Sequence, residues 1–452
     1  MSKDENNNKP RSDNAKPKVK GWISKTRFVE SVIVNEKPAF LIIDTNTGKF
    51  SVERRISTPN GPVRPLNKGE AGYMPYEFTL EEIKKLNESD ISLEGILEEI
   101  YEQVRIYLAT PVRDRILVTG DLVMTYCQEW ISTVHYPYFV GEYGSGKTTA
   151  ISLCGIIGYR CLITGSMTYA GIYNTLGNDE EGAGTIAEDE CQDMSKDKIY
   201  LYKDSYSKGK TVPRVRGANF SHVTYFKAFC CKWFAGTRTP DDDGLRERLV
   251  VVHMLGGKPE KNIKDVYSNK ELRQSLQILR NKLLCWKMKN IEKGFPKIES
   301  GLEGRDRELW NDFLSIFSGT KFEEESKKTA QYYLGQRHDA IRDRIEPKIL
   351  TIIKPMLEEN LEIGLLKIWS TITNSDELPG DLDNTARTFY PHGDEKITLN
   401  SLSRILTDKF HAVKRVKKEK RGDGKRPKVT YYVFDREVIK ILSEKYNIED
   451  YP

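Results

Sequence analysis

The sequence predicts an α/β fold built on a parallel sheet flanked by helices, with smaller modules before and after it. Between residues 137 and 260, short apolar runs such as YPYFVG, YRCLITG and RLVVVHM alternate with helical and loop segments. Strands that alternate with helices in this way form parallel sheets. The first of these runs leads into a glycine-rich loop that ends in Lys-Thr-Thr, at the start of an apolar helical stretch.

The composition is typical of a globular protein, and the sequence has no long apolar run. Of the 452 residues, 38% are hydrophobic and 30% are charged. No uninterrupted run of about 18 apolar residues occurs, so we expect no transmembrane helix. The seven cysteines form no C-x-x-C pair, a pattern that favours reduced thiols in a cytoplasmic protein over disulfides or zinc.

The N-terminal part is predicted to contain three segments. Residues 1–20 are polar and rich in Asn and Lys, a composition typical of a disordered arm. Residues 21–75 are expected to form a small β-rich module, because RFVESVIV, AFLIID and KFSVERRI alternate in polarity around the turn TNTG. A helical lead-in is expected over 76–136, where Thr79 and Glu82 have the spacing of a capping box.

Residues 137–260 are expected to form a P-loop NTPase core, because Gly141, Gly146, Lys147 and Thr148 match the Walker A pattern. Glycines let backbone N–H groups approach phosphate oxygens, and the helix N-terminus adds positive potential. Lys147 would reach the β- and γ-phosphates of ATP, and Thr148 would bind Mg²⁺. The predicted ATP-binding residues are Gly141, Glu142, Tyr143, Gly144, Ser145, Gly146, Lys147, Thr148 and Thr149.

A second apolar run ends in Glu188, Asp189 and Glu190 and is expected to supply the acidic half of the site. Asp189 would hold Mg²⁺ together with Thr148, and Glu190 would polarise the attacking water. Because three acids stand in a row, the register stays open, with Glu188 and Asp189 as the alternative pair. A surface acidic cluster is the remaining interpretation.

A third element, KAFCCKWFAGTRTPDDDGLRERLVVVHM, is expected to form two strands joined by a polar link. Thr237 at the tip of the first strand would touch the γ-phosphate or the attacking water. Arg248, with Arg246 as the alternate, could act as a finger on a neighbouring subunit's nucleotide, an effect worth about 10³–10⁵ in rate. Either arginine could instead pair with the acids at 241–243.

The C-terminal part is predicted as a helical domain over 261–372, a linker rich in Asn, Asp, Pro and Gly over 373–394, and a winged-helix-like domain over 395–452. In residues 409–428, ten of twenty side chains are Lys or Arg, which indicates either a solvated loop or contact with a phosphate backbone. Winged helices also mediate protein contacts. The candidate nucleic-acid-binding residues are Lys208, Lys210, Lys414, Arg415, Lys417, Lys418, Lys420 and Arg421.

The order of these motifs resembles that of AAA+-like ATPases: Walker A, the EDE run, the AGTR turn and LRERLVVV. More narrowly, PYFVGEYGSGKTTAISLCGIIGYRCLITG, LYKDSYSKGKTVPRV and GLEGRDRELWNDFLSIFSG are similar to segments of helicase-like ATPases from plasmids, phages and other mobile elements, of the primase-associated type. The resemblance covers residues 95–345. Glu188 departs from it, since the group usually has an apolar residue there, and no primase motif is found.

The sequence therefore predicts an ATP-hydrolysing nucleic-acid motor, a ring-forming DNA helicase or translocase that acts in the replication of a mobile element or virus. ATP and Mg²⁺ are the expected cofactors. The expected partners are single- or double-stranded DNA, further copies of the chain up to a hexamer, and replication proteins. Two alternatives stay open: a DNA-dependent loader ATPase, and a DNA-binding replication or partition regulator that uses ATP as a slow switch.

Overall fold

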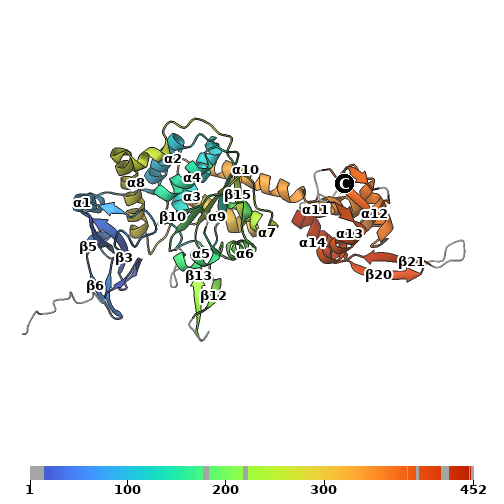
Figure 1. The fold of residues 1–452 in the computed structure, drawn as a ribbon, viewed down its shortest axis with the longest axis horizontal. Helices are drawn as coiled ribbons and strands as arrows, with labels where there is room; N and C mark the ends of the chain where they lie inside the picture. Colours follow the sequence, from blue (N-terminus) through green and yellow to red (C-terminus); the bar gives the residue numbers. More distant parts are fainter. Residues whose placement is uncertain are drawn as a thin grey trace, which may run out of the picture. The chain divides into compact units, whose positions relative to one another are not determined.

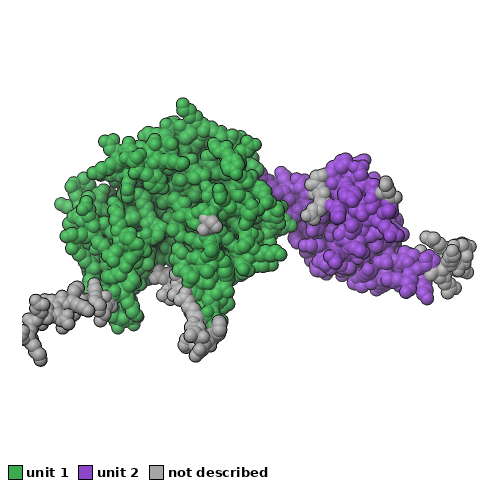
Figure 2. Space-filling view, in the orientation of Figure 1, with its two compact units in different colours: residues 1–333 green, residues 334–452 purple. Residues whose placement is uncertain are grey.

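The computed structural model describes residues 15–165, 167–176, 183–216, 222–383, 385–392, 396–418, 427–446 and 448. The chain divides into two compact units, residues 1–333 and 334–452 (Figure 2). The division falls inside helix α10 (Glu323–Arg342), and therefore within the helical domain predicted over 261–372. Within the described ranges, no helix combines the length and the apolar composition that a membrane crossing requires.

The centre of unit 1 is a five-stranded parallel sheet in the order β10-β11-β14-β9-β15. Its strands are β9 (Tyr136–Val140), β10 (Cys161–Thr164), β11 (Thr185–Glu188), β14 (Lys232–Gly236) and β15 (Leu249–His253). Most of their residues are buried, as in parallel sheets that are covered on both faces. Helix α4 (Lys147–Ile157) packs against four of the strands. The predicted parallel sheet flanked by helices is thus confirmed (Figure 1).

Most of the remaining helices of unit 1 surround this sheet, whereas α1 lies beside β5 of the N-terminal strands, and a β-hairpin projects from the unit (Figure 1). The hairpin pairs β12 (Thr211–Arg216) with β13 (His222–Lys227) and lies next to α5 (Tyr169–Leu176) and α6 (Lys196–Asp204). Thr79 and Glu82 form the predicted capping box at the start of α1. The other helical segments are α1 (Leu80–Glu88), α2 (Leu93–Tyr107), α3 (Val112–Met124), η1 (Cys191–Asp193), α7 (Asp243–Arg246), η2 (Ile263–Tyr267), α8 (Lys270–Lys289) and α9 (Gly304–Phe317).

The N-terminal strands form two small sheets and begin earlier than predicted. One sheet contains β2 (Lys20–Trp22), β3 (Arg27–Val34), β4 (Lys37–Asp44) and β5 (Lys49–Glu53), with β8 (Glu77–Phe78) beside β3; the other contains β1 (Lys16–Pro17), β6 (Ile56–Thr58) and β7 (Gly61–Arg64). Residues 1–20 were predicted to be a disordered arm, but Lys16 and Pro17 pair with β7, and Lys20 begins β2, where its side chain is buried and pairs with Glu129. Residues 1–14 lie outside the described residues.

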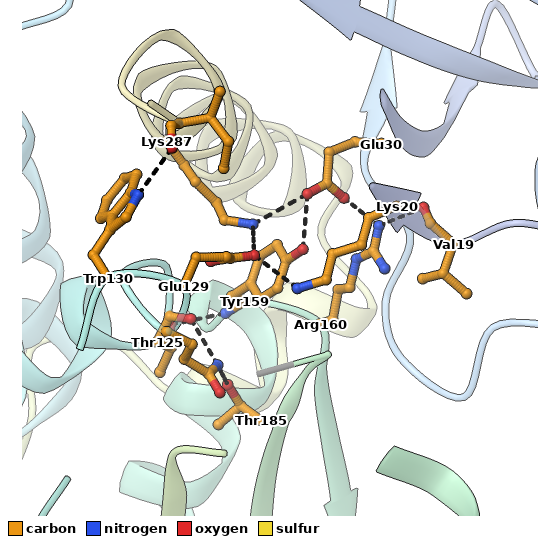
Figure 3. A network of polar contacts seen from close by, with 12 residues as sticks. Val19, Lys20, Glu30, Thr125, Glu129, Trp130, Tyr159, Arg160, Thr185 and Lys287 are labelled. Atoms are coloured by element: carbon orange, nitrogen blue, oxygen red, sulfur yellow. Dashed lines mark hydrogen bonds and ion pairs between the residues drawn. The ribbon is translucent and has the colours of Figure 1, made fainter. Parts of the chain in front are cut away.

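A buried network of charges joins the β-rich module to the sheet and to α8 (Figure 3). The Lys287 ammonium lies 3.2 Å from one carboxylate oxygen of Glu30 and 2.8 Å from that of Glu129. Lys20 pairs with Glu129 at 2.7 Å, and Arg160 pairs with Glu30. Five charged side chains thus connect β2, β3, α8 and the two ends of the segment that carries β9 and α4.

Unit 2 has its own core, which contains Ile353, Ile368, Leu402, Phe410 and Tyr432. Its elements are α11 (Ile345–Glu359), β16 (Glu362–Gly364), α12 (Leu365–Thr373), β17 (Gly380–Leu382), β18 (Thr388–Pro391), β19 (Ile397–Thr398), α13 (Leu399–Arg404), the π-helical turn η3 (Ile405–Lys409), β20 (Val413–Lys418), β21 (Lys428–Val433) and α14 (Arg436–Tyr446). β21 pairs antiparallel with both β16 and β20. Helices α11 and α12, predicted to belong to the preceding helical domain, contribute to this core.

The segment predicted as a linker, 373–394, contributes structure to unit 2. β17 and β18 lie in it and form an antiparallel sheet with β19. Phe389 is fully buried and Leu378 nearly so. Because the segment is mostly polar, its composition did not indicate that these two apolar side chains pack in the core of unit 2.

Candidate active site

The glycine-rich loop lies between the carboxyl end of β9 and the first residue of α4. Gly144 and Gly146 have φ angles of 77° and 97°, a left-handed conformation that glycine adopts without steric cost. A Cβ atom on Gly141 would lie 2.4 Å from the carbonyl oxygen of Met254 and 2.7 Å from the hydroxyl of Ser145. The fold of the loop therefore requires glycine at these three positions.

The loop and α4 line a pocket with a volume of about 290 Å³. No side chain caps the N-terminus of α4, so its first N–H groups are available to an anion. Among the buried polar atoms of the described residues, the Ser145 hydroxyl has no hydrogen-bond partner. The lining residues are Tyr143, Gly144, Ser145, Gly146, Lys147, Thr148, Thr149, Ser152, Asp189, Glu190, Gln192, Gly236, Thr237, Asn262, Ile263 and Lys264.

Seven of the nine predicted ATP-binding residues line this pocket, while Gly141 and Glu142 contribute backbone atoms behind it. The Lys147 ammonium donates hydrogen bonds to the carbonyl oxygens of Gly141 at 2.7 Å and Glu142 at 2.6 Å. These bonds place a positive charge inside the curve of the loop. A cradle of backbone N–H groups with one ammonium suits the phosphates of a nucleotide.

The acidic end of β11 meets the start of α4. The Thr148 hydroxyl donates a hydrogen bond of 2.8 Å to one carboxylate oxygen of Asp189, and the Glu190 N–H donates one of 2.9 Å to the other. Glu190 has a φ of 56°, and its exposed side chain lines the pocket. A hydroxyl and a carboxylate are oxygen ligands of the kind that Mg²⁺ prefers, so the residues present fit a magnesium-bound nucleotide.

Glu188 faces away from the pocket, although it immediately precedes Asp189. Its side chain is only 1% exposed and pairs with Lys198. It also accepts hydrogen bonds from the Tyr202 hydroxyl at 2.8 Å and from the Met167 N–H at 3.1 Å. Of the two registers that the sequence left open, this placement favours Asp189 with Glu190.

Thr237 reaches the pocket because β14 lies between β9 and β11 in the sheet. Its N–H donates a 3.4 Å hydrogen bond to the side-chain oxygen of Gln192. A Cβ atom on Gly236 would lie 2.3 Å from the Tyr138 hydroxyl and 2.8 Å from that same oxygen of Gln192. The sequence motifs did not indicate Gln192, which faces the site from the turn that follows Glu190.

No protein-family model matches the chain, and no curated protein matches its sequence. Among solved structures, the chain is similar to the apo form of the C-terminal region of NrS-1, with 12% identity and a TM-score of 0.36 over 90% of this chain and 96% of that one. It is also similar to Cch of SCCmec type IV, described as an active helicase, with 11% identity and a TM-score of 0.31 over 85% and 96% of the two chains. The JCV helicase gives 10% identity and a TM-score of 0.24 over 57% and 73%. TM-scores this low carry no functional conclusion, which has to come from the site itself.

Neither of the two arginines predicted as a finger lines the pocket of its own chain. The Arg248 guanidinium lies 4.4 Å from the centre of the Tyr206 ring and donates to the Gly244 carbonyl oxygen. Arg246 pairs with Asp241 at 3.2 Å and with Asp243 at 3.6 Å. The pairing with the acids at 241–243, left open by the sequence, is thus realised by Arg246.

The residues predicted to contact nucleic acid differ in their exposure and in their contacts within the chain. Lys208 donates a 2.9 Å hydrogen bond to the carbonyl oxygen of Glu129 and lies over the Phe229 ring. Lys210 is exposed and pairs with Asp204 at 2.6 Å. Lys414, Arg415, Lys417 and Lys418 are exposed on β20, whereas Lys420 and Arg421 lie outside the described residues.

Proposed function

We propose that the chain is an ATP-hydrolysing nucleic-acid motor, a ring-forming DNA helicase or translocase that acts in the replication of a mobile element or virus. The observation that carries the hydrolytic half is the contact between Thr148 and Asp189 at the mouth of the glycine cradle. It brings a phosphate-binding loop, a metal-binding pair and the exposed carboxylate of Glu190 to one edge of the sheet, where parallel α/β sheets bind their ligands.

Each group has a distinct task in this proposal. The loop N–H groups and Lys147 bind the phosphates, and Thr148 with Asp189 holds Mg²⁺, which neutralises charge on the phosphate oxygens when bound. Glu190 accepts the proton of the attacking water, for which an exposed carboxylate at the rim of the pocket is suitable. Thr237 and Gln192 orient the water or the terminal phosphate from β14 and the turn beside it.

The β12–β13 hairpin supports the motor half of the proposal. It projects from unit 1 (Figure 1) and carries Arg214 together with Val215 and Tyr225, of which Tyr225 is 59% exposed. Basic and aromatic side chains on one element are typical of surfaces that hold single strands. In a ring of subunits, we infer that this hairpin contacts the nucleic acid, with Lys210 at its base, and that Arg248 acts on the nucleotide of a neighbour.

Unit 2 supplies a second nucleic-acid contact in this proposal. The chain runs through α11, β16 and α12, then through the small sheet of β17, β18 and β19, and then through α13, β20 and β21. This order, with β21 central in a three-stranded antiparallel sheet, is what a winged-helix-like domain would have. The basic face of β20 would then contact phosphates as a wing, while α13 would lie toward a groove.

Steady-state ATP hydrolysis, with and without single- and double-stranded DNA, tests the proposed function. We expect DNA to stimulate turnover, and we expect Lys147→Ala to abolish nucleotide binding or turnover, because the loop holds the Lys147 ammonium inside its curve, where the phosphates would lie. Negligible turnover under all conditions, with DNA affinity that differs between ATP and ADP, would instead indicate the slow switch. Stimulated turnover without strand separation would indicate the loader.

The wing makes a separate prediction about salt. The triple variant Lys414→Ala, Arg415→Ala, Lys418→Ala should weaken DNA binding and reduce the slope of log K against log salt by about three, because each phosphate contact contributes about one. Fluorescence anisotropy with a labelled duplex between 50 and 200 mM salt, roughly the range over which such contacts respond, measures this slope.

Three exposed cations elsewhere in unit 2 provide the control for charge alone. Lys367, Arg436 and Lys440 lie on α12 and α14 and are exposed. Their replacement by alanine removes the same charge from the chain as the wing variant does. An equal loss of slope in both variants would show that net charge, and not β20, determines binding.

A further inference from the structure

Glu188 is a charged residue at the end of a strand that is otherwise buried and uncharged. The strand β11 has the sequence TIAE, and the next residue, Asp189, accepts the hydrogen bond of Thr148. A carboxylate buried in this way is costly unless it is paired and hydrogen-bonded. Both oxygens of Glu188 have partners, and these partners lie on α6 and in the segment just before α5, the two helices next to the β12–β13 hairpin.

The first connection runs through α5. One oxygen of Glu188 accepts the N–H of Met167, two residues before α5 begins. On α5, the rings of Tyr169 and Tyr173 lie under the guanidinium of Arg214 from β12, at 4.3 Å and 5.0 Å from their centres. The Tyr173 ring also lies 4.9 Å from the ring of Phe226 on β13. Both strands of the hairpin therefore pack against the helix that starts beside Glu188.

The second connection runs through α6. The same carboxylate pairs with Lys198 and accepts the hydroxyl of Tyr202, and both residues lie on α6. Immediately after α6, the carbonyl oxygen of Ser205 accepts a 3.3 Å hydrogen bond from the buried ammonium of Lys232. That ammonium also donates at 3.4 Å to the carbonyl oxygen of Ala228, the residue that follows β13. Helix α6 is thus fastened to the base of the hairpin.

We propose that Glu188 is a positioning residue that couples the nucleotide site to the β12–β13 hairpin through α5 and α6. This inference rests on the proposed function, since it assumes that the pocket binds a nucleotide and that the hairpin responds to it. Asp189 and Glu188 are consecutive, so a change in the contact of Asp189 with Thr148 moves the end of β11. Because one carboxylate holds both helices, they follow that movement together. Chains of hydrogen bonds and packed side chains of this kind can carry coupling between two sites.

The test compares the hairpin in the presence and absence of a bound nucleotide. Hydrogen–deuterium exchange of the amides of β12 and β13 is measured without nucleotide and with Mg²⁺ and AMP-PNP, whose affinity is measured separately by competition with a fluorescent ATP analogue. In the unmodified chain, AMP-PNP should change the exchange rate of the hairpin. In Glu188→Gln that change should disappear, with DNA stimulation of ATP turnover reduced about tenfold, within the usual range of coupling between sites.

A second variant keeps the test valid if Glu188→Gln does not fold. Tyr202→Phe removes one hydroxyl and leaves the ring, so it breaks only part of the connection through α6. It should reduce the change in exchange that AMP-PNP causes in the hairpin by at least about half. Its matched control is Tyr333→Phe, because the Tyr333 hydroxyl also donates a 2.8 Å hydrogen bond to a buried carboxylate, that of Asp114, in another part of unit 1. Tyr333→Phe should keep the full response.

The outcomes separate the coupling from the proposed function. If the unmodified chain binds AMP-PNP and its hairpin does not respond, or if both variants respond as the unmodified chain does, the coupling is overturned and the proposed function stands. If Tyr333→Phe loses the response as Tyr202→Phe does, the effect is general destabilisation and the coupling is also overturned. If the unmodified chain does not bind AMP-PNP, the proposed function fails first and the coupling fails with it.

Discussion

Replacement of Glu190 by glutamine is expected to lower ATP turnover by about 10²–10⁴-fold, the usual contribution of a general base, while ATP stays bound. The amide keeps the size of the side chain and cannot accept a proton from water. The residues that hold phosphate and metal are unchanged, and the N–H of residue 190 can still donate to Asp189. Single-turnover hydrolysis, together with the affinity for a fluorescent ATP analogue, measures the two effects separately.

Asp193→Asn is the matched control for this variant. Asp193 is an exposed acid three residues further on, and it pairs with Arg238 without lining the pocket. It should hydrolyse ATP at nearly the rate of the unmodified chain. A contrary result would be hydrolysis that stops in Glu188→Gln and continues in Glu190→Gln, since Glu188 and Asp189 would then be the functional pair.

The parts of the site that could be predicted from the sequence are those fixed by local geometry. The loop needs glycine where a Cβ atom would clash, as at Gly141, or where φ is positive, as at Gly144 and Gly146. The spacing of these glycines can therefore be recognised in the sequence. Alternation of apolar runs and helices likewise indicates the parallel sheet. Gln192 and the segment at 262–264 reach the pocket only through the order of the strands, and no local pattern marks them.

The sequence misled where charged residues are buried in pairs. Lysine in a polar segment indicates solvent, so residues 1–20 were predicted to be a disordered arm, and nothing in the sequence indicated that Lys208 packs on the protein. In the fold, Lys20 is 4% exposed and pairs with Glu129, and Lys208 bonds to the backbone of that same glutamate. Glu188 is a similar case, since Lys198 and Tyr202 on a helix that follows it, together with the N–H of Met167, satisfy its buried carboxylate. Partners far apart in sequence decide such positions.

The largest effect on stability is expected from Glu30→Gln, in the network that joins the β-rich module to the sheet (Figure 3). Glu30 is fully buried and faces Arg160 and Lys287, and it accepts the hydroxyl of Tyr159 at 2.8 Å. When Glu30 is neutralised, Glu129 is the one carboxylate of the network that remains for Lys20, Arg160 and Lys287. Removal of one partner from a buried ion pair costs about 3–5 kcal/mol, and chemical denaturation of the full chain measures this loss.

Glu53→Gln controls for the loss of a carboxylate in the same module. Glu53 lies on β5 and pairs with Arg27 at the surface, where both side chains are more than a third exposed. Surface pairs contribute about 0–1 kcal/mol, so the free energy of unfolding should change little. If Glu30→Gln is no more destabilising than Glu53→Gln, the network does not hold the module to the sheet.

The dependence of stability on pH gives the same network a second test. Burial raises the pKa of Glu129, but the attraction of Lys20 and Lys287 outweighs burial and holds the pKa at about 2, below its ordinary value of 4.5. A carboxyl group with a lowered pKa stabilises the fold fully above its ordinary pKa, and this contribution is lost as the pH falls toward the pKa of the folded state. The pKa of Glu30 is lowered as well, since Arg160 and Lys287 outweigh its burial. Stability should therefore fall between pH 4.5 and 2, and less steeply in Glu30→Gln, because that variant has already lost one of the two carboxylates that must take up a proton.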